Sequence, residues 1–339
     1  MKRLLSARLF RILILSIILA VGVVFSLPSL LVLNIQHDQA QALPAVPEQF
    51  PVTVDPKNKS IVENAQVNAY LESADSPLQA AVGNAGNIFW RVFRWAAVTI
   101  AALPLYQNIA AVDGRFVTIT PGMRKEQVAS AFANALGWST EQQQEFLTRG
   151  KYASLPLPEG SFSPGVYLVK LGTTPSTAQA LVNERFANDV LAHYGTTTAQ
   201  MVPLDEALTI ASLIQRETGG PEDMRLISGI IWNRLFANMH IQIDATLQYA
   251  KANSVAVGKW WPSVVPADRF IRSPYNTYLH QGLPPTPIAN PSVAAIVAAL
   301  NPLDTPCLFY FHDQEGKIHC TDTYAAHVAL LKKYYGQGK

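Results

Sequence analysis

The sequence predicts an α+β protein with a single N-terminal transmembrane helix, a small α+β module and a larger domain of mixed α/β structure. Three observations lead to this prediction. A long apolar run without charge follows a basic N-terminus, two strand-turn-helix units follow each other in the middle of the chain, and amphipathic helices alternate with short strands in the C-terminal part. With 339 residues, the chain is long enough for two ordinary domains.

Charge and motifs exclude several classes of function. The chain has 26 Lys and Arg residues against 24 Asp and Glu residues, and the basic residues are scattered, so we expect no nucleic-acid partner. The sequence contains no zinc-protease helix motif, phosphate-binding glycine loop or serine-hydrolase elbow. We therefore expect neither a metal nor another cofactor.

The membrane anchor is expected at residues 12–35. This run carries no charge and is long enough to cross a bilayer as one helix, and residues 1–11 before it contain basic but no acidic side chains. The basic flank predicts that the N-terminus lies in the cytoplasm and that the chain after the anchor lies on the outer side of the cell membrane. The alternative is a signal peptide cleaved near residues 40–42, whose apolar region would be unusually long.

Residues 36–112 are expected to form a stalk. The stretch is polar and rich in proline, with one short helix near residues 61–72. Within it, residues 88–105 are aromatic and apolar but include Arg91 and Arg94. An interfacial helix at the membrane surface and a plain buried helix both fit this segment, while a second span is disfavoured because its charge-free part is short.

Residues 113–200 are expected to form the small module. Alternation predicts strands at residues 115–120 and 165–171, and helical periodicity predicts helices at residues 124–136 and 177–186. Generic α+β structure fits the same pattern, so the periodicity alone assigns no function to the module.

Residues 201–339 are expected to form the larger domain, whose central feature is a helix from Leu204 to Glu217. Apolar residues recur on one face of this helix, and the same face carried forward reaches Glu217 in the last turn. Burial and the negative end of the helix dipole would both raise the pKa of this carboxyl, so that it could donate a proton near neutral pH. The alternative is a glutamate that faces solvent or pairs with Arg216 or Arg225.

The residues after this helix suggest further elements and a possible pocket. A second helix has its buried face at Met224, Ile227 and Ile231, and Asp244 is placed to cap a third helix, a role favoured over a catalytic one. Trp260 and Trp261 could stack on a sugar ring, although Trp more often covers a core. The loop over residues 273–291 combines tyrosines, prolines and hydroxyl groups, as in the lining of a pocket.

Two cysteines flank a predicted β-hairpin near the C-terminus. Cys307 and Cys320 enclose strands at residues 308–312 and 317–320, and different hairpin registers would place them diagonally or directly opposite. Outside the cytoplasm a disulfide can persist, and two buried free thiols are the alternative.

Four ordered motifs in the C-terminal part resemble the YceG-like family of membrane-anchored endolytic murein transglycosylases. They are ASLIQRETG at residues 211–219, WNRL at 232–235, IQIDATLQY at 241–249 and SPYNTYLHQGLPPTPIANP at 273–291. The strand-turn-helix units look like the LysM-like portion that the family places before its catalytic part. This chain departs from the family pattern at Ile318, Cys320 and Val328, and residues 251–272 look longer than usual.

The resemblance implies cleavage of the β-1,4 bond between N-acetylmuramic acid and N-acetylglucosamine in peptidoglycan strands, which leaves 1,6-anhydro ends. Glu217 matches the family's catalytic glutamate. The candidate substrate-binding residues come from the matching motifs: Gln242, Asp244, Tyr275, Asn276, Thr277, Tyr278 and Asn290. The implied partners are peptidoglycan glycan strands, the membrane through one helix, and the enzymes of cell-wall synthesis.

Two competing hypotheses remain open. A glycoside hydrolase would use Asp244 as a second carboxylate, at a separation of about 5 to 10 Å from Glu217. A peptidoglycan-binding scaffold would use the LysM-like units and the anchor without catalysis, although the intact motif around Glu217 argues against a purely binding role.

Overall fold

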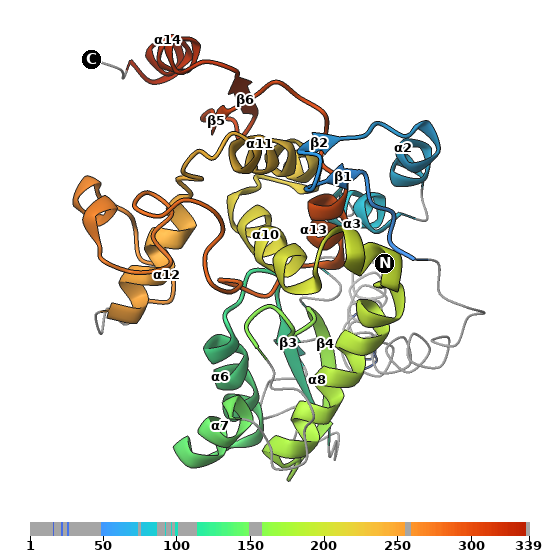
Figure 1. The fold of residues 1–339 in the computed structure, drawn as a ribbon. Coiled ribbons are helices and arrows are strands. Elements are labelled where there is room, and N and C mark those ends of the chain that lie inside the picture. Colours follow the sequence, from blue (N-terminus) through green and yellow to red (C-terminus); the bar gives the residue numbers. More distant parts are fainter. Residues whose placement is uncertain are drawn as a thin grey trace, which may run out of the picture.

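A computed structural model describes residues 49–73, 76–86, 114–148, 158–254 and 259–336, with a few isolated helical positions before residue 101 (Figure 1). The protein has a mixed α+β fold that is mostly helical and contains small antiparallel sheets, as the sequence predicts. The described strands pair as β1 with β2, β3 with β4, and β5 with β6, each pair antiparallel.

The described elements follow each other along the chain in this order: β1 (Val54–Asp55), β2 (Ser60–Ile61), α2 (Ala65–Glu72), α3 (Pro77–Gly86), β3 (Gly114–Ile119), α6 (Lys125–Leu136), α7 (Thr140–Leu147), β4 (Gly165–Lys170), α8 (Pro175–Asp189), η1 (Leu191–His193), α9 (Thr196–Met201), α10 (Leu204–Glu217), η2 (Pro221–Asp223), α11 (Met224–Phe236), α12 (Asp244–Ser254), η3 (Pro266–Phe270), α13 (Val293–Leu300), β5 (Phe309–His312), β6 (Ile318–Thr321) and α14 (Tyr324–Tyr335).

The small module consists of residues 114–148 and 158–189 and forms the lower end of the molecule in Figure 1. Strands β3 and β4 pair along their whole length, from Gly114 opposite Lys170 to Ile119 opposite Gly165. Three phenylalanines with no exposed surface, Phe132, Phe146 and Phe162, fill the space between this sheet and the surrounding helices. The module therefore has an apolar core of its own.

The larger part is built around α10 and α13. Residues Ala294 to Leu300 of α13 are at most 3% exposed, because this helix is short, almost wholly apolar and enclosed by neighbouring elements. The indole N–H of Trp232 in α11 donates to the carbonyl oxygen of Ala299 at 2.9 Å, which satisfies one carbonyl at the end of α13. Helix α10 packs on α13 with its fully buried face, so the end of α10 is held in a fixed place.

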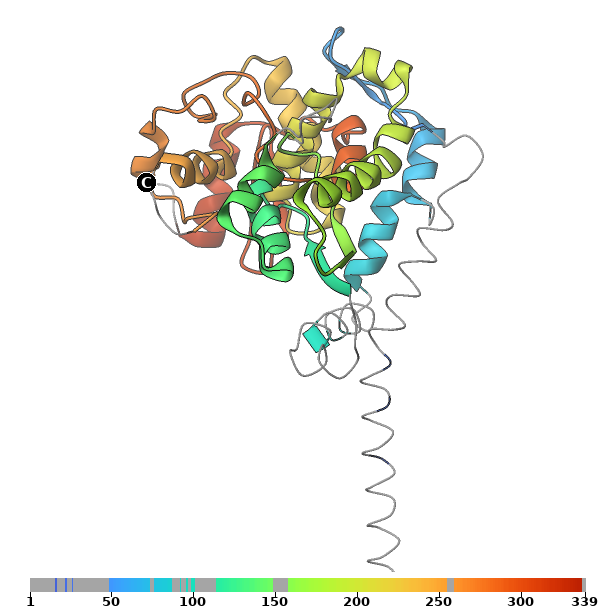
Figure 2. The ribbon, with the colours of Figure 1, turned by 90° about the horizontal axis from the view of Figure 1, so that it is seen from below.

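Residues 49–73 and 76–86 differ from the stalk expected for this stretch, because they fold onto the larger part. In Figures 1 and 2 they run along one flank of the molecule. Phe50, Val54, Leu71 and Leu78 are buried in the same core as α10 and α13. The segment is polar on average, but these four apolar side chains are spaced so that they reach this core, a pattern that the mean composition does not reveal. The expected short helix is present as α2.

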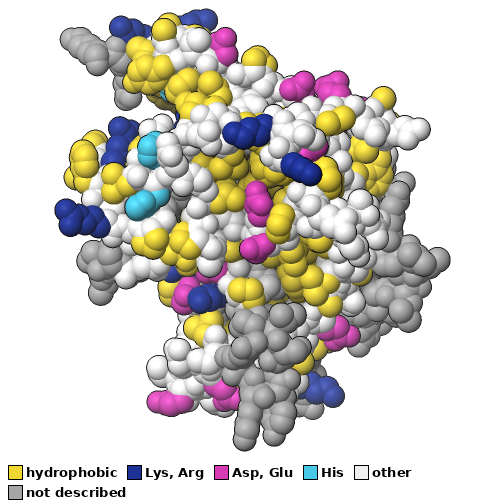
Figure 3. Space-filling model, in the orientation of Figure 1, with side chains coloured by type: hydrophobic (Ala, Val, Ile, Leu, Met, Phe, Trp, Pro, Cys, Tyr) yellow, Lys and Arg dark blue, Asp and Glu magenta, His cyan; other side chains and the backbone are white. Residues whose placement is uncertain are grey.

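The expected transmembrane helix at residues 12–35 lies outside the described residues except for isolated positions, as does most of residues 88–105. Within the described ranges, no helix has the length and apolar character that crossing a membrane requires. Figure 3 shows Lys, Arg, Asp and Glu side chains dispersed over the visible face.

Asn290 joins the small module to the larger part. Its side chain is fully buried, its Oδ1 accepts hydrogen bonds from the backbone N–H groups of Gly160 and Phe162, and its Nδ2 donates to Met123 and Glu159. The backbone of Asn290 is also bonded to residues 122 and 123. All the polar capacity of this side chain is thus used between the two parts of the protein.

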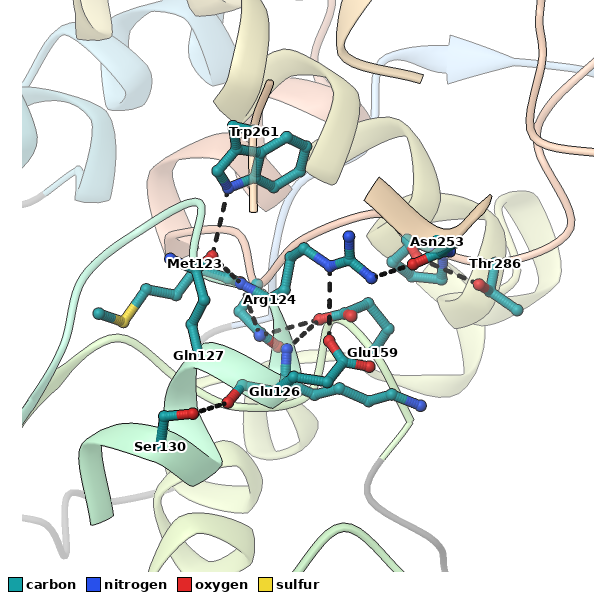
Figure 4. Close-up of polar contacts among 12 residues, drawn as sticks. Met123, Arg124, Glu126, Gln127, Ser130, Glu159, Asn253, Trp261 and Thr286 are labelled. Atoms are coloured by element: carbon teal, nitrogen blue, oxygen red, sulfur yellow. Dashed lines mark hydrogen bonds and ion pairs between the residues drawn. The ribbon is translucent and has the colours of Figure 1, made fainter. Parts of the chain in front are cut away.

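A second set of contacts lies at the same junction (Figure 4). Arg124 in the small module forms an ion pair with Glu126 at 3.4 Å, donates to the Asn253 side chain, and lies over the Tyr249 ring. The indole N–H of Trp261 donates to Oε1 of Gln127 at 3.2 Å. These contacts tie the segment around Trp261 to the start of α6.

Glu159 at this junction should make the stability of the protein depend on pH. Burial and the nearby Glu126 raise the pKa of Glu159 from 4.5 to about 8. Between these two pH values the Glu159 carboxyl is ionised in the unfolded chain but protonated in the folded protein. The free energy of unfolding therefore falls as the pH rises from about 4.5 to 8, by up to ~1.4 kcal/mol per pH unit. We expect Glu159→Gln to reduce this slope in denaturant unfolding measured between pH 5 and 8, because Glu217 and other carboxyls with raised pKa values remain. Glu184→Gln, at an exposed position on α8, should keep the slope.

The C-terminal hairpin carries a disulfide. Strands β5 and β6 pair with His312 opposite Ile318 and Tyr310 opposite Cys320. Neither of the two expected registers, which pair His312 with Lys317 or with Glu315, is present. Cys307 and Cys320 are joined by a disulfide, with their Cα atoms 5.7 Å apart. Of the two possibilities left open by the sequence, the structure contains the bridge, and the covalent link fastens the base of β5 to β6.

Candidate active site

Glu217 is the last residue of α10, and the sequence explains why this helix is stable. Asp205 and Glu206 in the first turn interact favourably with the positive end of the helix dipole, and the face from Ala207 to Ile214 is buried. Glu217 is half-buried at the end of this anchored face. Its carboxyl therefore reaches its surroundings from a rigid support.

Two other elements supply hydrogen bonds to the Glu217 carboxyl. The Tyr310 hydroxyl in β5 donates to Oε2 at 2.9 Å, and the backbone N–H of Ala245 in the first turn of α12 donates to Oε1 at 3.4 Å. The side chain thus lies between the C-terminal end of one helix and the N-terminal end of another, whose dipoles act on it in opposite directions. Each carboxyl oxygen has a donor.

The surroundings shift the pKa of Glu217 upward. Burial is the largest cause and raises it, and the nearby Asp244 adds to the increase. The hydrogen bonds from Tyr310 and Ala245 and the charge of His312 lower it, but they do not outweigh burial. A carboxyl of this kind can hold a proton at a higher pH than a solvent-exposed glutamate and still form a stabilised carboxylate once it has given that proton away.

Replacing Tyr310 with Phe should raise the pKa of Glu217 further. The variant keeps the ring but loses the hydroxyl whose hydrogen bond stabilises the charged carboxylate and lowers the pKa of Glu217. Carbon-detected NMR titration of the Glu217 carboxyl in the two proteins measures this difference. Tyr324→Phe, at an exposed ring, should leave the titration unchanged, and a lower pKa in Tyr310→Phe would contradict the assignment.

Asp244 lies close to Glu217 but in a different environment. It is exposed at the start of α12, next to the residue whose N–H reaches Glu217, and its Oδ1 accepts a hydrogen bond from the Tyr278 hydroxyl at 2.6 Å. The guanidinium carbon of Arg269 lies 5.2 Å from the centre of the Tyr278 ring. One half-buried acid and one exposed, hydrogen-bonded carboxylate therefore face the same region.

The structure divides the candidates at residues 275–278 into two pairs. Tyr275 and Tyr278 keep part of their surface exposed, and the Tyr275 hydroxyl forms a hydrogen bond with Thr286 at 2.8 Å. Asn276 and Thr277 are buried and hold the loop together. The Asn276 Nδ2 donates to the backbone of residues 269 and 271, and Oγ1 of Thr277 accepts from the N–H of Ile243. Only the two tyrosines present surface to a ligand.

Gln242 and Asn290 complete the set of candidates. Gln242 is exposed, has a positive φ of 56°, and its Oε1 accepts a hydrogen bond from Arg234 at 3.4 Å. Asn290 lies at the junction with the small module and has no exposed surface. The structure therefore groups Glu217, Asp244 and Tyr278, and it places Asn290 apart from them.

Three residues near Glu217 were absent from the sequence-based candidates. Tyr310 contacts Glu217 directly. His312 lies two residues further along the same strand, and its Nε2 is 3.1 Å from Oδ2 of Asp223. The alternation of β5 places the side chains of Tyr310 and His312 on one face, which is the signal that the sequence contained. What the sequence could not reveal is that this face turns toward the end of α10.

Comparison with known proteins finds similar sequences. A family model described as the YceG-like family matches residues 97–333. A Streptococcus pneumoniae protein named endolytic murein transglycosylase is 32% identical over 178 residues, which cover 50% of this chain and 31% of that protein. A Bacillus subtilis protein of the same name is 29% identical over 242 residues, 64% of each chain. The matched part thus spans about a third of the pneumococcal relative and somewhat less than two thirds of the other.

A solved structure has a similar fold. The crystal structure of a YceG-like protein from Listeria monocytogenes superposes with a TM-score of 0.55, at 22% sequence identity, over 71% of this chain and 80% of that one. This likeness concerns the fold alone.

Proposed function

The chain belongs to the YceG-like family, and on that premise we propose that it is an endolytic murein transglycosylase. Its substrate would be the peptidoglycan glycan strand, cut at the β-1,4 bond between N-acetylmuramic acid and N-acetylglucosamine. The observation that carries this proposal is Glu217, a half-buried carboxyl with a raised pKa and a hydrogen-bond donor on each oxygen.

One carboxyl suffices for the proposed reaction because the substrate supplies its own nucleophile. Protonated Glu217 gives its proton to the glycosidic oxygen while the bond from that oxygen to the anomeric carbon breaks. The resulting carboxylate then takes the proton from the 6-hydroxyl of the same muramoyl ring, whose oxygen bonds to the anomeric carbon. The product is a 1,6-anhydro end, no water is consumed, and Glu217 is protonated again.

The contacts of Glu217 suit both halves of this cycle. Burial favours the protonated acid that starts the reaction. The Tyr310 hydroxyl and the Ala245 N–H favour the carboxylate that exists between the two proton transfers. Asp244, hydrogen-bonded to Tyr278, would face the substrate, with Tyr275 and Tyr278 as the partly exposed rings beside it.

A two-carboxylate glycoside hydrolase is the second candidate, because Asp244 is close enough to influence the pKa of Glu217. A hydrolase would need Asp244 to activate water or to attack the anomeric carbon. Purified peptidoglycan strands incubated with the full chain distinguish the two. The transglycosylase predicts that Asp244→Asn keeps the ability to produce anhydro ends, whereas the hydrolase predicts reducing ends that disappear in that variant.

We also propose where the protein acts. The charge-free run at residues 12–35 and the basic residues before it support a single membrane anchor with the N-terminus in the cytoplasm and the remaining chain on the outer side. The small module would act as the LysM-like portion that contacts glycan. A tethered enzyme of this kind would meet nascent strands beside the enzymes of cell-wall synthesis.

A further inference from the structure

Arg216, the residue before Glu217, is a half-buried cation that lacks a hydrogen-bond acceptor or ion-pair partner among the described residues. In the described part of the chain no hydrogen bond or ion pair joins its guanidinium to another residue, and its Nε is buried without an acceptor. Arginine stays charged in proteins even where burial lowers its pKa, as it does here. A buried N–H without an acceptor costs free energy, so an anion that binds this guanidinium from outside the chain would satisfy it.

Other arginines in the interior form polar contacts within the fold. Arg234 donates to the carbonyl oxygens of Leu308 and Ile241, each at 2.6 Å. Arg225 donates to the carbonyl oxygen of Asn301 at 2.9 Å and to the Asn68 side chain. Arg124 also has buried nitrogens without a hydrogen bond, but it forms an ion pair with Glu126 and donates to the Asn253 side chain. Arg216 differs from these three because its guanidinium has no such contact among the described residues.

The guanidinium of Arg216 is nevertheless held in place. Its Cζ lies 4.0 Å from the centre of the Trp261 ring, and Trp261 is itself fixed by its hydrogen bond to Gln127 (Figure 4). On another side lies Gly122, where an added Cβ would come within 3.2 Å of Arg216 Nη1. A guanidinium stacked on an aromatic ring offers its N–H groups at its edge, in a geometry that matches a carboxylate.

We propose that Arg216 binds a carboxylate of the muramoyl side chain of the substrate, next to the bond that Glu217 cleaves. This inference rests on the proposed function, since the glycan strand brings the anion. Two adjacent residues at the end of α10 would then have different roles. Glu217 would transfer protons, and Arg216 would bind the charged substituent of the same sugar. No ion pair joins Glu217 to Arg216 among the described residues, although the two are adjacent in α10.

Two groups on the substrate could supply the carboxylate, and the probes separate them. One set of glycan fragments carries stem peptides with free carboxyl groups, a second set carries the same peptides with those groups amidated, and a third is free of peptide and exposes the lactyl carboxylate. Binding is measured by calorimetry with the full chain in the Glu217→Gln background, so that no cleavage occurs during the measurement.

We expect amidation to weaken binding by about tenfold or more when Arg216 is present, and by less than about twofold in Arg216→Gln. Arg216→Lys should keep part of the preference, because it keeps the charge and loses the planar fork. Lys170→Gln, an exposed cation at the end of β4, should keep the full preference. If only the peptide-free fragments depend on Arg216, the lactyl carboxylate is the ligand.

Equal affinity of the unmutated Arg216 protein for all three sets would overturn the inference, as would a preference that Arg216→Gln leaves intact. The comparison between free and amidated fragments needs no substitution at Arg216, so a folding defect in a variant does not obscure it. Failure of the proposed function has a different signature, namely the absence of anhydro ends when wild-type protein is incubated with the same fragments.

Discussion

Glu217→Gln is expected to lower kcat for strand cleavage by at least about a thousandfold. Glutamine has the shape of the protonated acid. Its amide oxygen can accept from the Ala245 N–H while its NH2 group donates to the Tyr310 hydroxyl, which can also act as an acceptor, so the local structure should persist. It has no acidic proton to give to the glycosidic oxygen and cannot take one from the 6-hydroxyl, so both halves of the cycle are lost. Release of soluble fragments from purified strands measures the effect.

Asp244→Asn is the matched control for this variant. It also changes one carboxyl group to an amide, at the start of α12 and close to Glu217. We expect this variant to retain activity within about tenfold, because Asp244 transfers no proton in the proposed reaction. A Glu217→Gln protein that folds normally and retains most of its activity would rule out Glu217 as the catalytic acid.

Asn290→Ala is expected to destabilise the protein by about 3 to 5 kcal/mol. The substitution leaves the N–H groups of Gly160 and Phe162 buried without an acceptor, and each unsatisfied group costs roughly 1 to 3 kcal/mol. It also removes the two bonds donated by Nδ2. The free energy of unfolding in denaturant, measured for wild type and variant, gives the difference.

Asn188→Ala, at an exposed position on α8, is the control and should change stability by less than about 0.5 kcal/mol. Because Asn290 was also a candidate for substrate binding, KM should be measured on the same protein. A variant of normal stability with a raised KM would show that Asn290 binds substrate rather than joining the two parts of the molecule.

The sequence predicted elements that rest on local patterns. Helix α10 was predictable from a buried stripe with acidic residues at its start, and the strands of the small module from their alternation. Helix α7 is absent from the predicted elements, although Ser139 caps it and Gln142 completes a capping box. This helix is strongly polar, so it lacks the apolar periodicity on which the prediction of helices rests. The packing of residues 49–73 and 76–86 depends on contacts with residues far along the chain, which periodicity does not report.

The candidate site was predictable to the same extent. Glu217 stood out because a carboxyl on the buried face of a helix is unusual. Asn276 and Thr277 stabilise their loop, and Asn290 joins the small module to the larger part. These roles depend on which groups the folded chain brings together, such as the carbonyl oxygens that accept hydrogen bonds from Asn276, and the sequence pattern does not show them. Tyr310 reaches Glu217 across 93 positions of sequence, a pairing set by how the disulfide-linked hairpin lies over α10.

The most direct test of the proposed reaction is digestion of purified glycan strands by the full chain in water enriched in oxygen-18, followed by mass spectrometry of the fragment ends. A lytic transglycosylase predicts ends that are lighter than reducing ends by one water and carry no oxygen-18, because the 6-hydroxyl attacks in place of solvent. Reducing ends that each contain one oxygen-18 atom would contradict the account and assign the chain to the hydrolases.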